Sequence, residues 1–139
     1  MYKSVLVAMA LDHDLSHKLL AFARSIAAPD AKITALHVIE EITGTGNAGV
    51  REDLRQSGAA SAQALLKQKL ESFPEVEGRI MEGHVSRTLV DVATERGIDC
   101  LVMGSHKPGL VDYLIGSTAA RVVRHAPCSV HVYRDTEST

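Results

Sequence analysis

Two glycine–serine pairs carry the clearest chemical signal in this sequence. Gly104-Ser105 ends an apolar run over residues 99–103, and Gly116-Ser117-Thr118 opens a segment with helical spacing. Glycine lets a backbone approach a ligand closely. The first N–H groups of a helix have no partner within it and suit phosphate oxygens, and the helix dipole adds partial positive charge. The pattern predicts an anion-binding seat and favours nucleotide binding.

The loop between the two pairs adds further candidates. Lys107 could place a positive charge beside outer phosphates, and Pro108 would stiffen the loop. Each residue also has an ordinary explanation: Ser117 as a helix cap, Gly116 as a turn residue and Lys107 as a solvated surface charge. Both interpretations stay open for single residues, and their combination favours phosphate binding.

Strand-like and helix-like segments alternate along the chain. Helical periodicity begins at Asp14 or Ser16, and the long second helix has an apolar stripe from Ala59 to Phe73. Residues 28–30, Pro74 and Gly97 are helix breakers, and Ser86 is an expected helix cap. The expected strands cover residues 4–9, 32–39, 76–81, 99–103 and 129–133, and the expected last helix covers residues 117–125.

This alternation predicts one α/β domain over residues 1–139. Right-handed crossovers with short connections give a doubly wound, Rossmann-like parallel sheet of five strands in the order 3-2-1-4-5, with helices on both faces. In such sheets the ligand crevice lies beyond the carboxyl ends of the strands where the winding reverses, here between the first and fourth strands. The motif that starts with Gly104 lies at that place.

Composition excludes several partner classes. A net charge of -2, no Trp, two Phe and three Tyr argue against a nucleic-acid surface. The sequence shows no segment apolar enough for a membrane span and no signal peptide, so we expect a cytoplasmic protein. Cys100 and Cys128 lack metal-ligand or redox spacing and are interpreted as reduced core thiols.

Other motifs have plainer interpretations. Residues 44–49 fit G-x-G-x-x-G but follow the second strand and Glu40-Glu41, so they are interpreted as a mobile loop. His13 and His17 are interpreted as exposed polar residues at a helix start rather than as a metal site. Ser105 and His106 are not interpreted as a catalytic pair. We expect His37 and His131, which lie inside strands, to have satisfied hydrogen bonds or to lie at an interface. The positive charges of the last helix, at Arg121, Arg124 and His125, are expected to offset the helix dipole.

Three segments together resemble the universal stress protein family. They are Leu36-His37-Val38-Ile39, residues 102–106 and residues 114–130, and the similarity extends over essentially the whole chain. The resemblance implies a homodimeric, cytoplasmic protein with a nucleotide-binding-like fold. Its ATP-binding members hold adenosine between the first, second and fourth strands, with phosphates along a Gly-x2-Gly-x9-Gly-(Ser/Thr) loop.

Transferred to this chain, the resemblance implies a defined set of nucleotide-binding residues. Lys107 stands where the loop pattern has its second glycine and Gly116 arrives one residue early, as in a shorter-loop branch that includes ATP binders. Ala10 stands where ATP-binding members carry an aspartate that reads adenine, which leaves that task to backbone groups near Val38. The set is Ala8, Met9, Ala10, Val38, Met103, Gly104, Ser105, His106, Lys107, Gly109, Gly116, Ser117 and Thr118.

The expected function is that of a stress-response protein that holds ATP with Mg²⁺ and acts through partner proteins with little turnover. No residue is assigned as catalytic or metal-binding, although slow hydrolysis or phosphorylation of Ser105, Ser117 or Thr118 stays open. One alternative is a nucleotide-free interaction module, favoured by Ala10 and the missing second glycine and opposed by Lys107 and residues 116–118. Another is a small enzyme using a different adenine cofactor.

The last predicted strand suggests self-association. Val130, Val132 and Tyr133 alternate in a segment expected at a sheet edge, and an unpaired edge invites another chain. The family resemblance implies that this strand pairs with its copy across a two-fold axis. We therefore expect a homodimer, with a dimer of dimers as a further option.

Overall fold

The computed structural model describes residues 1–11, 15–40, 48–105 and 115–135. Its centre is a parallel sheet in the order β3-β2-β1-β4-β5, which confirms the predicted topology. The strands are β1 (Tyr2–Ala8), β2 (Ala27–Ile39), β3 (Val76–Glu82), β4 (Cys100–Gly104) and β5 (Ser129–Tyr133).

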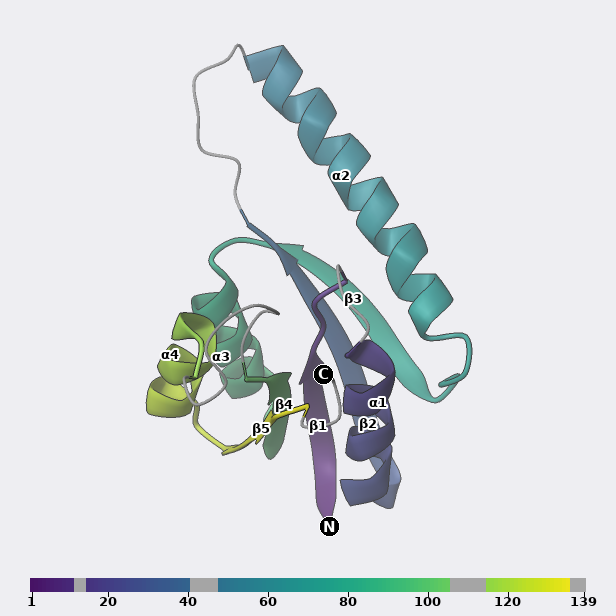
Figure 1. The fold of residues 1–139 in the computed structure, drawn as a ribbon, viewed down its shortest axis with the longest axis vertical. Coiled ribbons are helices and arrows are strands. Elements are labelled where there is room, and N and C mark those ends of the chain that lie inside the picture. Colours follow the sequence, from purple (N-terminus) through teal and green to yellow (C-terminus); the bar gives the residue numbers. More distant parts are fainter. Residues whose placement is uncertain (12–14, 41–47, 106–114, 136–139) are drawn as a thin grey trace.

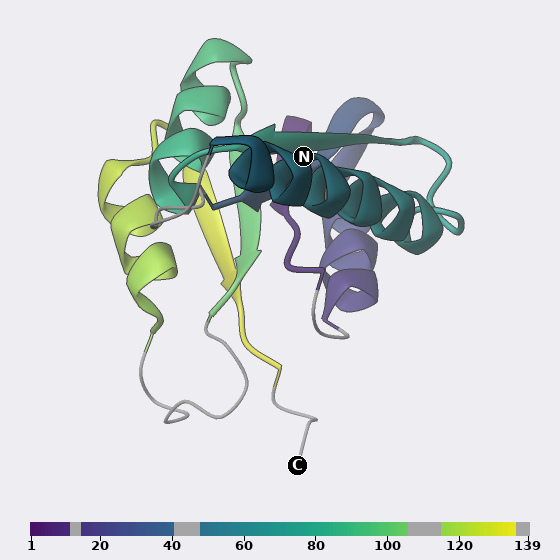
Figure 2. The same ribbon diagram turned by 90° about the horizontal axis from the view of Figure 1, so that it is seen from above.

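Helices cover both faces of the sheet, as predicted. They are α1 (Ser16–Ile26), α2 (Ala48–Lys69), α3 (Val85–Glu95) and α4 (Ser117–His125). α1 and α2 lie on one face, and α3 and α4 lie together on the other (Figures 1 and 2). Each face has its own apolar cluster.

The two central strands are buried from both sides. Val5 and Val7 of β1 face the cluster under α1 and α2, whereas Leu6 faces the cluster under α3 and α4. All three side chains are 0% exposed. Leu101, the register partner of Leu6 on β4, is equally buried. A strand buried on both faces reads as a continuous apolar run, which is why β1 and β4 were recognisable in the sequence.

The amino-terminal end of the sheet is held together by one carboxylate. Asp99 precedes β4, and its side-chain oxygens accept hydrogen bonds from the backbone N–H groups of Lys3 at 2.8 Å and Ser4 at 2.9 Å. The Asp99 N–H in turn donates to the Ser4 carbonyl at 2.9 Å. Partial burial raises the pKa of Asp99, but these backbone N–H bonds outweigh it, so its pKa lies below the ordinary range.

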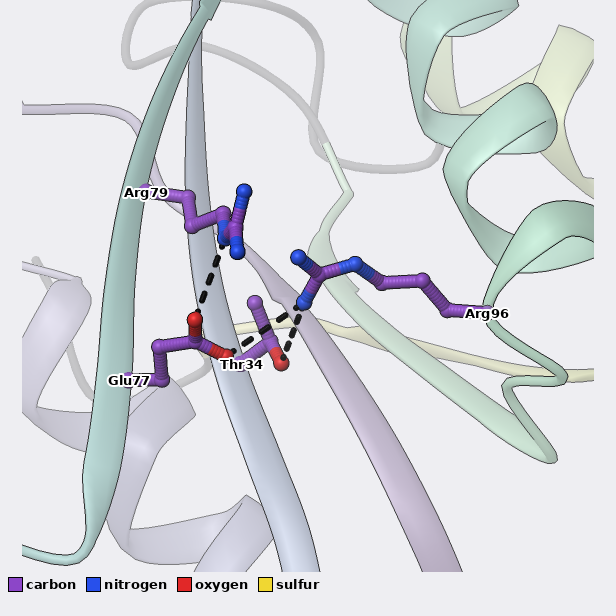
Figure 3. Close-up of polar contacts among 4 residues, drawn as sticks. All are labelled: Thr34, Glu77, Arg79 and Arg96. Carbon is purple, nitrogen blue, oxygen red and sulfur yellow. Dashed lines mark hydrogen bonds and ion pairs between the residues drawn. The ribbon is translucent and has the colours of Figure 1, made fainter.

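A polar cluster fastens the carboxyl end of α3 to the sheet (Figure 3). The Arg96 guanidinium donates to Glu77 at 3.4 Å and to the Thr34 hydroxyl at 3.5 Å, and Arg79 donates to the other Glu77 oxygen at 3.1 Å. Above all the hydrogen bond from Arg79, together with the two arginine charges, lowers the pKa of Glu77. Thr34 is buried, whereas Glu77 is 55% exposed, so this contact lies at the rim of the core.

α2 is longer than the sequence pattern predicted. The apolar stripe begins at Ala59, but the helix begins at Ala48, so the end of the predicted loop over residues 44–49 is helical; residues 41–47 lie outside the described chain. The amino-terminal half projects away from the sheet (Figure 1), and Val50 and Leu54 are exposed. Because this half of the helix does not pack on the sheet, its sequence needs no periodic apolar residues. The helix there depends on local helix propensity.

β2 and α3 also begin differently from the prediction. β2 starts at Ala27, and the pairing jumps from Tyr2↔Ala27 to Ser4↔Lys32, so the break predicted at residues 28–30 appears as an irregularity inside the strand. Ser86 was expected to cap α3, but the cap is His84, whose Nδ1 accepts from the Arg87 N–H. Ser86 lies two residues further on, already within the first turn of the helix, and bonds to His84 instead. Gly97 ends the helix region as predicted, with a φ of 63°.

Candidate functional site

A cavity of about 800 Å³ opens at the carboxyl ends of β1, β2 and β4. It lies at the point where the winding of the sheet reverses, the place where α/β sheets of this kind bind ligands. Its size falls within the range of small-molecule sites. The position of the cavity therefore matches the crevice expected from the topology.

Ten of the predicted nucleotide-binding residues line this cavity. They are Ala8, Met9, Ala10, Val38, Met103, Gly104, Ser105, Gly116, Ser117 and Thr118. His106, Lys107 and Gly109 lie outside the described residues. The fold thus brings together segments that are far apart in sequence, around one space.

The end of β1 leaves backbone groups of β2 facing the cavity. Met9 is the last residue to bond along β2, donating its N–H to the Leu36 carbonyl at 2.8 Å. Ala10 turns away, and its carbonyl accepts from the Ser16 hydroxyl at 3.4 Å. Alternate residues of a strand direct their backbone groups to the same side, so the N–H and C=O of Val38 point past the end of β1. This gives the cavity a backbone donor and acceptor beside each other.

The start of α4 supplies backbone donors at the other end of the cavity. The cap residue is Gly116, whose N–H donates to the Ser105 carbonyl at 2.7 Å, and no side chain within the described residues caps this helix. The alternative interpretation of Ser117 as the helix cap is therefore wrong. Ser117 and Thr118 line the cavity in the first turn, where helix N–H groups have no partner within the helix. These amides suit an anion.

Gly104 lies where β4 ends and the cavity begins. A Cβ built at this position would stand 2.8 Å from Cδ2 of Leu15. Any larger residue would therefore require Leu15, just before α1, to move. Because glycine has no side chain, it leaves room for Leu15 and lets the backbone at the end of β4 face the cavity.

Among the β2 residues that line the cavity, His37 carries the polar side chain. Its Nδ1 lies 2.8 Å from the carbonyl oxygen of Met9. The prediction that His37 is a satisfied strand histidine is confirmed for this nitrogen, yet the residue also lines the cavity. His131, the other strand histidine, stacks on Phe22 with ring centroids 3.9 Å apart.

Two walls of the cavity come from helices that carry no sequence motif. α2 contributes Ser61, Ala62 and Leu65, and α3 contributes Val85 and Leu89. None belongs to a motif, because each looks like an ordinary helix residue. The remaining unpredicted lining residues are Leu11, Leu36, His37, Ile39, Glu40 and Ala119, neighbours in sequence of predicted ones. Proximity to the strand ends is the signal that could have found these last six.

Further predictions concern metal, thiol and membrane chemistry. Within residues 1–11, 15–40, 48–105 and 115–135, no three His, Cys, Asp or Glu side chains gather into a metal-binding group. Both cysteines are free, and burial raises the pKa of the Cys100 thiol to about 11. Among the described helices, none has both the length and the apolar character needed to cross a membrane.

Other proteins share this sequence pattern and fold. Universal stress protein G of Shigella flexneri is 28% identical over 142 residues, covering 96% of this chain and 100% of that protein. The structure of a universal stress protein from Lactobacillus plantarum is 29% identical and superposes with a TM-score of 0.81, over 96% of this chain and 98% of that one.

Structures of more distant proteins with this fold contain adenine nucleotides. One universal stress protein was crystallised with cAMP, at 24% identity and a TM-score of 0.70, over 95% of this chain and 97% of that one. Others, from Archaeoglobus fulgidus with dAMP and Arabidopsis thaliana with AMP, each superpose with a TM-score of 0.63. These are 19% and 22% identical and cover 94% and 97% of this chain, and 97% and 94% of their own chains.

The family assignment rests on the match over the length of the chain. The universal stress protein family is matched from residue 1 to residue 134. Sequence, topology and relatives agree with the resemblance seen in the strand ends and the carboxyl-terminal third. This chain belongs to the universal stress protein family.

Proposed function

We propose that this protein binds an adenine nucleotide in the cavity at the carboxyl ends of β1, β2 and β4. The observation that carries the proposal is the asymmetry of the cavity: backbone donors of α4 lie at one end and an apolar slot bordered by β2 lies at the other. A nucleotide has the same asymmetry, with an anionic phosphate and a flat base. Nucleotide-bound relatives support the adenine class.

The base occupies the slot between apolar side chains. Val38 of β2 and Val85 of α3 border this part of the cavity on one face of the sheet, and Leu65 of α2 lines it on the other, so burying a base between them removes apolar surface from water. The Val38 N–H and C=O supply the donor and acceptor that the edge of adenine needs. Ala10 offers no polar side chain, so backbone recognition replaces the carboxylate found in other ATP-binding members of the family.

The phosphates lie at the start of α4. The N–H groups of Ser117 and Thr118 and the positive end of the helix dipole favour negative charge there. We assign Lys107 to the outer phosphates of ATP. Mg²⁺ would be held chiefly by the phosphate oxygens and water, as it usually is in nucleotide sites, with the Ser105 and Ser117 hydroxyls nearby.

The proposed role is nucleotide-dependent signalling in stress response through partner proteins, with little turnover. Among the described residues that line the cavity, the ionisable side chains are His37 and Glu40, and both belong to the β2 end rather than the phosphate end. Efficient hydrolysis requires a general base within reach of the attacking water. The protein would therefore hold its nucleotide rather than consume it.

Isothermal titration tests the proposal directly. AMP and ATP, the latter with and without Mg²⁺, should each release binding heat, and Lys107→Ala should weaken ATP by about tenfold while leaving AMP nearly unchanged. If Lys107→Ala lowers the affinities for AMP and ATP equally, the assignment of Lys107 to the outer phosphates is wrong. Absence of heat with every nucleotide would overturn the proposal and favour the nucleotide-free interaction module.

We also propose a homodimer formed through β5. This strand is an edge of the sheet, and Val130 and Val132 are only partly buried although they pack on the cluster under α3 and α4. An edge strand presents unpaired N–H and C=O groups that a second copy can bond. Size-exclusion chromatography with light scattering should give twice the monomer mass at micromolar concentration. A monomer mass would contradict the dimer without affecting the nucleotide site.

A further inference from the structure

The hydrogen bond of His37 fixes the tautomer of its ring. A backbone carbonyl can only accept, so the contact at 2.8 Å between Nδ1 and the Met9 carbonyl places the proton of the neutral imidazole on Nδ1. Nε2 then carries a lone pair and is an acceptor. Within the described part of the chain, Nε2 has no hydrogen-bond partner, and His37 lines the cavity.

The register of the sheet places this acceptor at the base end of the cavity. Ala8 pairs with Leu36, which brings Met9 beside His37 at the point where β1 ends. Ile33 and Ala35 face α1 and α2, so two-residue alternation puts His37 on the same side, where Ser61 and Leu65 of α2 line the cavity. The start of α4 lies across β1 and β4 from this position, about 10 Å away at the usual strand spacing.

We propose that Nε2 of His37 accepts a hydrogen bond from the exocyclic amino group of adenine and so makes His37 a base-selecting residue. The inference rests on the proposed nucleotide function. With phosphates at α4, the base extends over the end of β1 toward β2. The amino group has two hydrogens: one suits the Val38 carbonyl and the other suits Nε2. Glu40 is the other ionisable side chain lining this end of the cavity, within the described residues.

A pair of ligands that differ only in that amino group provides the test. AMP and purine riboside 5′-monophosphate carry the same sugar and phosphate, but the second lacks the exocyclic amine. The wild-type protein should prefer AMP, and His37→Leu should lower the ratio of the two affinities by about five- to tenfold, as expected for one hydrogen bond. His37→Gln, which keeps an acceptor, should retain part of the preference.

Several outcomes separate this inference from the proposed function. If neither ligand binds the wild-type protein, the proposed function fails. If both bind and the affinity ratio is the same in His37→Leu, only the assignment of His37 fails. Equal weakening of both ligands, with an unchanged ratio, would mean that His37 merely supports the end of β1 through Met9.

Nitrogen NMR of the wild-type protein gives a measurement that needs no variant. Histidine ring spectra should show a protonated Nδ1 and an unprotonated Nε2 at His37, and AMP should shift the Nε2 resonance more than purine riboside 5′-monophosphate does. A protonated Nε2 in the neutral ring, or identical shifts with both ligands, would overturn the inference even if His37→Leu fails to fold.

Discussion

The two ends of the sheet use backbone N–H groups in opposite ways. At the amino end, the N–H groups of Lys3 and Ser4 are bonded by the carboxylate of Asp99, an anion that the chain itself supplies. At the carboxyl end, the first N–H groups of α4 line a cavity, and no described side chain caps the helix. One end of the sheet is therefore completed by the chain itself, whereas the other leaves the donors of α4 beside an open cavity.

The largest effect should come from giving the carboxyl end an anion of its own. Ser117→Glu places a carboxylate in the first turn of α4, where it favours the helix dipole but repels phosphate. We expect AMP affinity to fall about 100-fold, equivalent to about 2.7 kcal/mol, while thermal stability stays the same or rises slightly. Titration calorimetry and a thermal melt measure the two quantities.

A matched control is available one turn further along α4. Ala120→Glu adds the same charge at an exposed position that does not line the cavity. It should reduce AMP affinity by less than about threefold, because salt screens an exposed charge beyond the first turn. If both variants lose affinity equally, the donors at the start of α4 do not hold the phosphate.

Removing the Asp99 carboxylate from the amino end of the sheet should lower stability and leave AMP affinity almost unchanged. Asp99→Ala leaves the Lys3 and Ser4 N–H groups without their carboxylate acceptor and should lower the free energy of unfolding by about 1–2 kcal/mol. AMP affinity should stay within about twofold, since the cavity lies at the opposite end. Urea denaturation checks the first expectation; a loss of AMP binding without a loss of stability would contradict the comparison.

The contribution of Asp99 should also depend on pH. Its pKa in the folded protein is lowered, so its stabilising effect is fully present above the ordinary aspartate pKa of about 3.9 and is lost as the pH falls through the folded value. The stability difference between wild type and Asp99→Asn should therefore be constant near neutral pH and shrink below about pH 4. A difference that grew on acidification would contradict the sign of this shift.

The smallest effect is expected at the polar cluster that ends α3. Glu77→Gln removes the charge that Arg79 and Arg96 approach (Figure 3), but Arg79 and Glu77 are more than half exposed and Arg96 is 32% exposed. Exposed ion pairs contribute little, so the unfolding free energy should change by less than about 1 kcal/mol. If Glu77→Gln lowers the unfolding free energy as much as Asp99→Ala does, this cluster also stabilises the amino end of the sheet.

Much of the fold followed from local patterns. α4 and β5 have the predicted bounds, and the strand order follows from alternation and right-handed crossovers. The amino-terminal half of α2 was missed because it lies over no apolar surface, and periodicity reports burial rather than helix formation. The capping by His84 was missed because histidine is not among the common cap residues.

The candidate site divides in the same way. Gly104, Gly116, Ser117 and Thr118 were predictable because they belong to two short motifs, one at a strand end and one at a helix start. The α2 and α3 walls were not, since side chains such as Leu65 and Leu89 meet the site only through packing.

By itself the sequence determined the order of elements, the two-sided burial of β1 and β4, and the motif that opens α4. Only the tertiary structure decided which neighbours these elements acquire: the Asp99 carboxylate against β1, the α2 wall of the cavity, and the Met9 carbonyl against His37. The physical reason is range. Periodicity and turn chemistry act between near neighbours, whereas contacts between residues 28 or 95 positions apart depend on strand register, which the whole packed sheet sets.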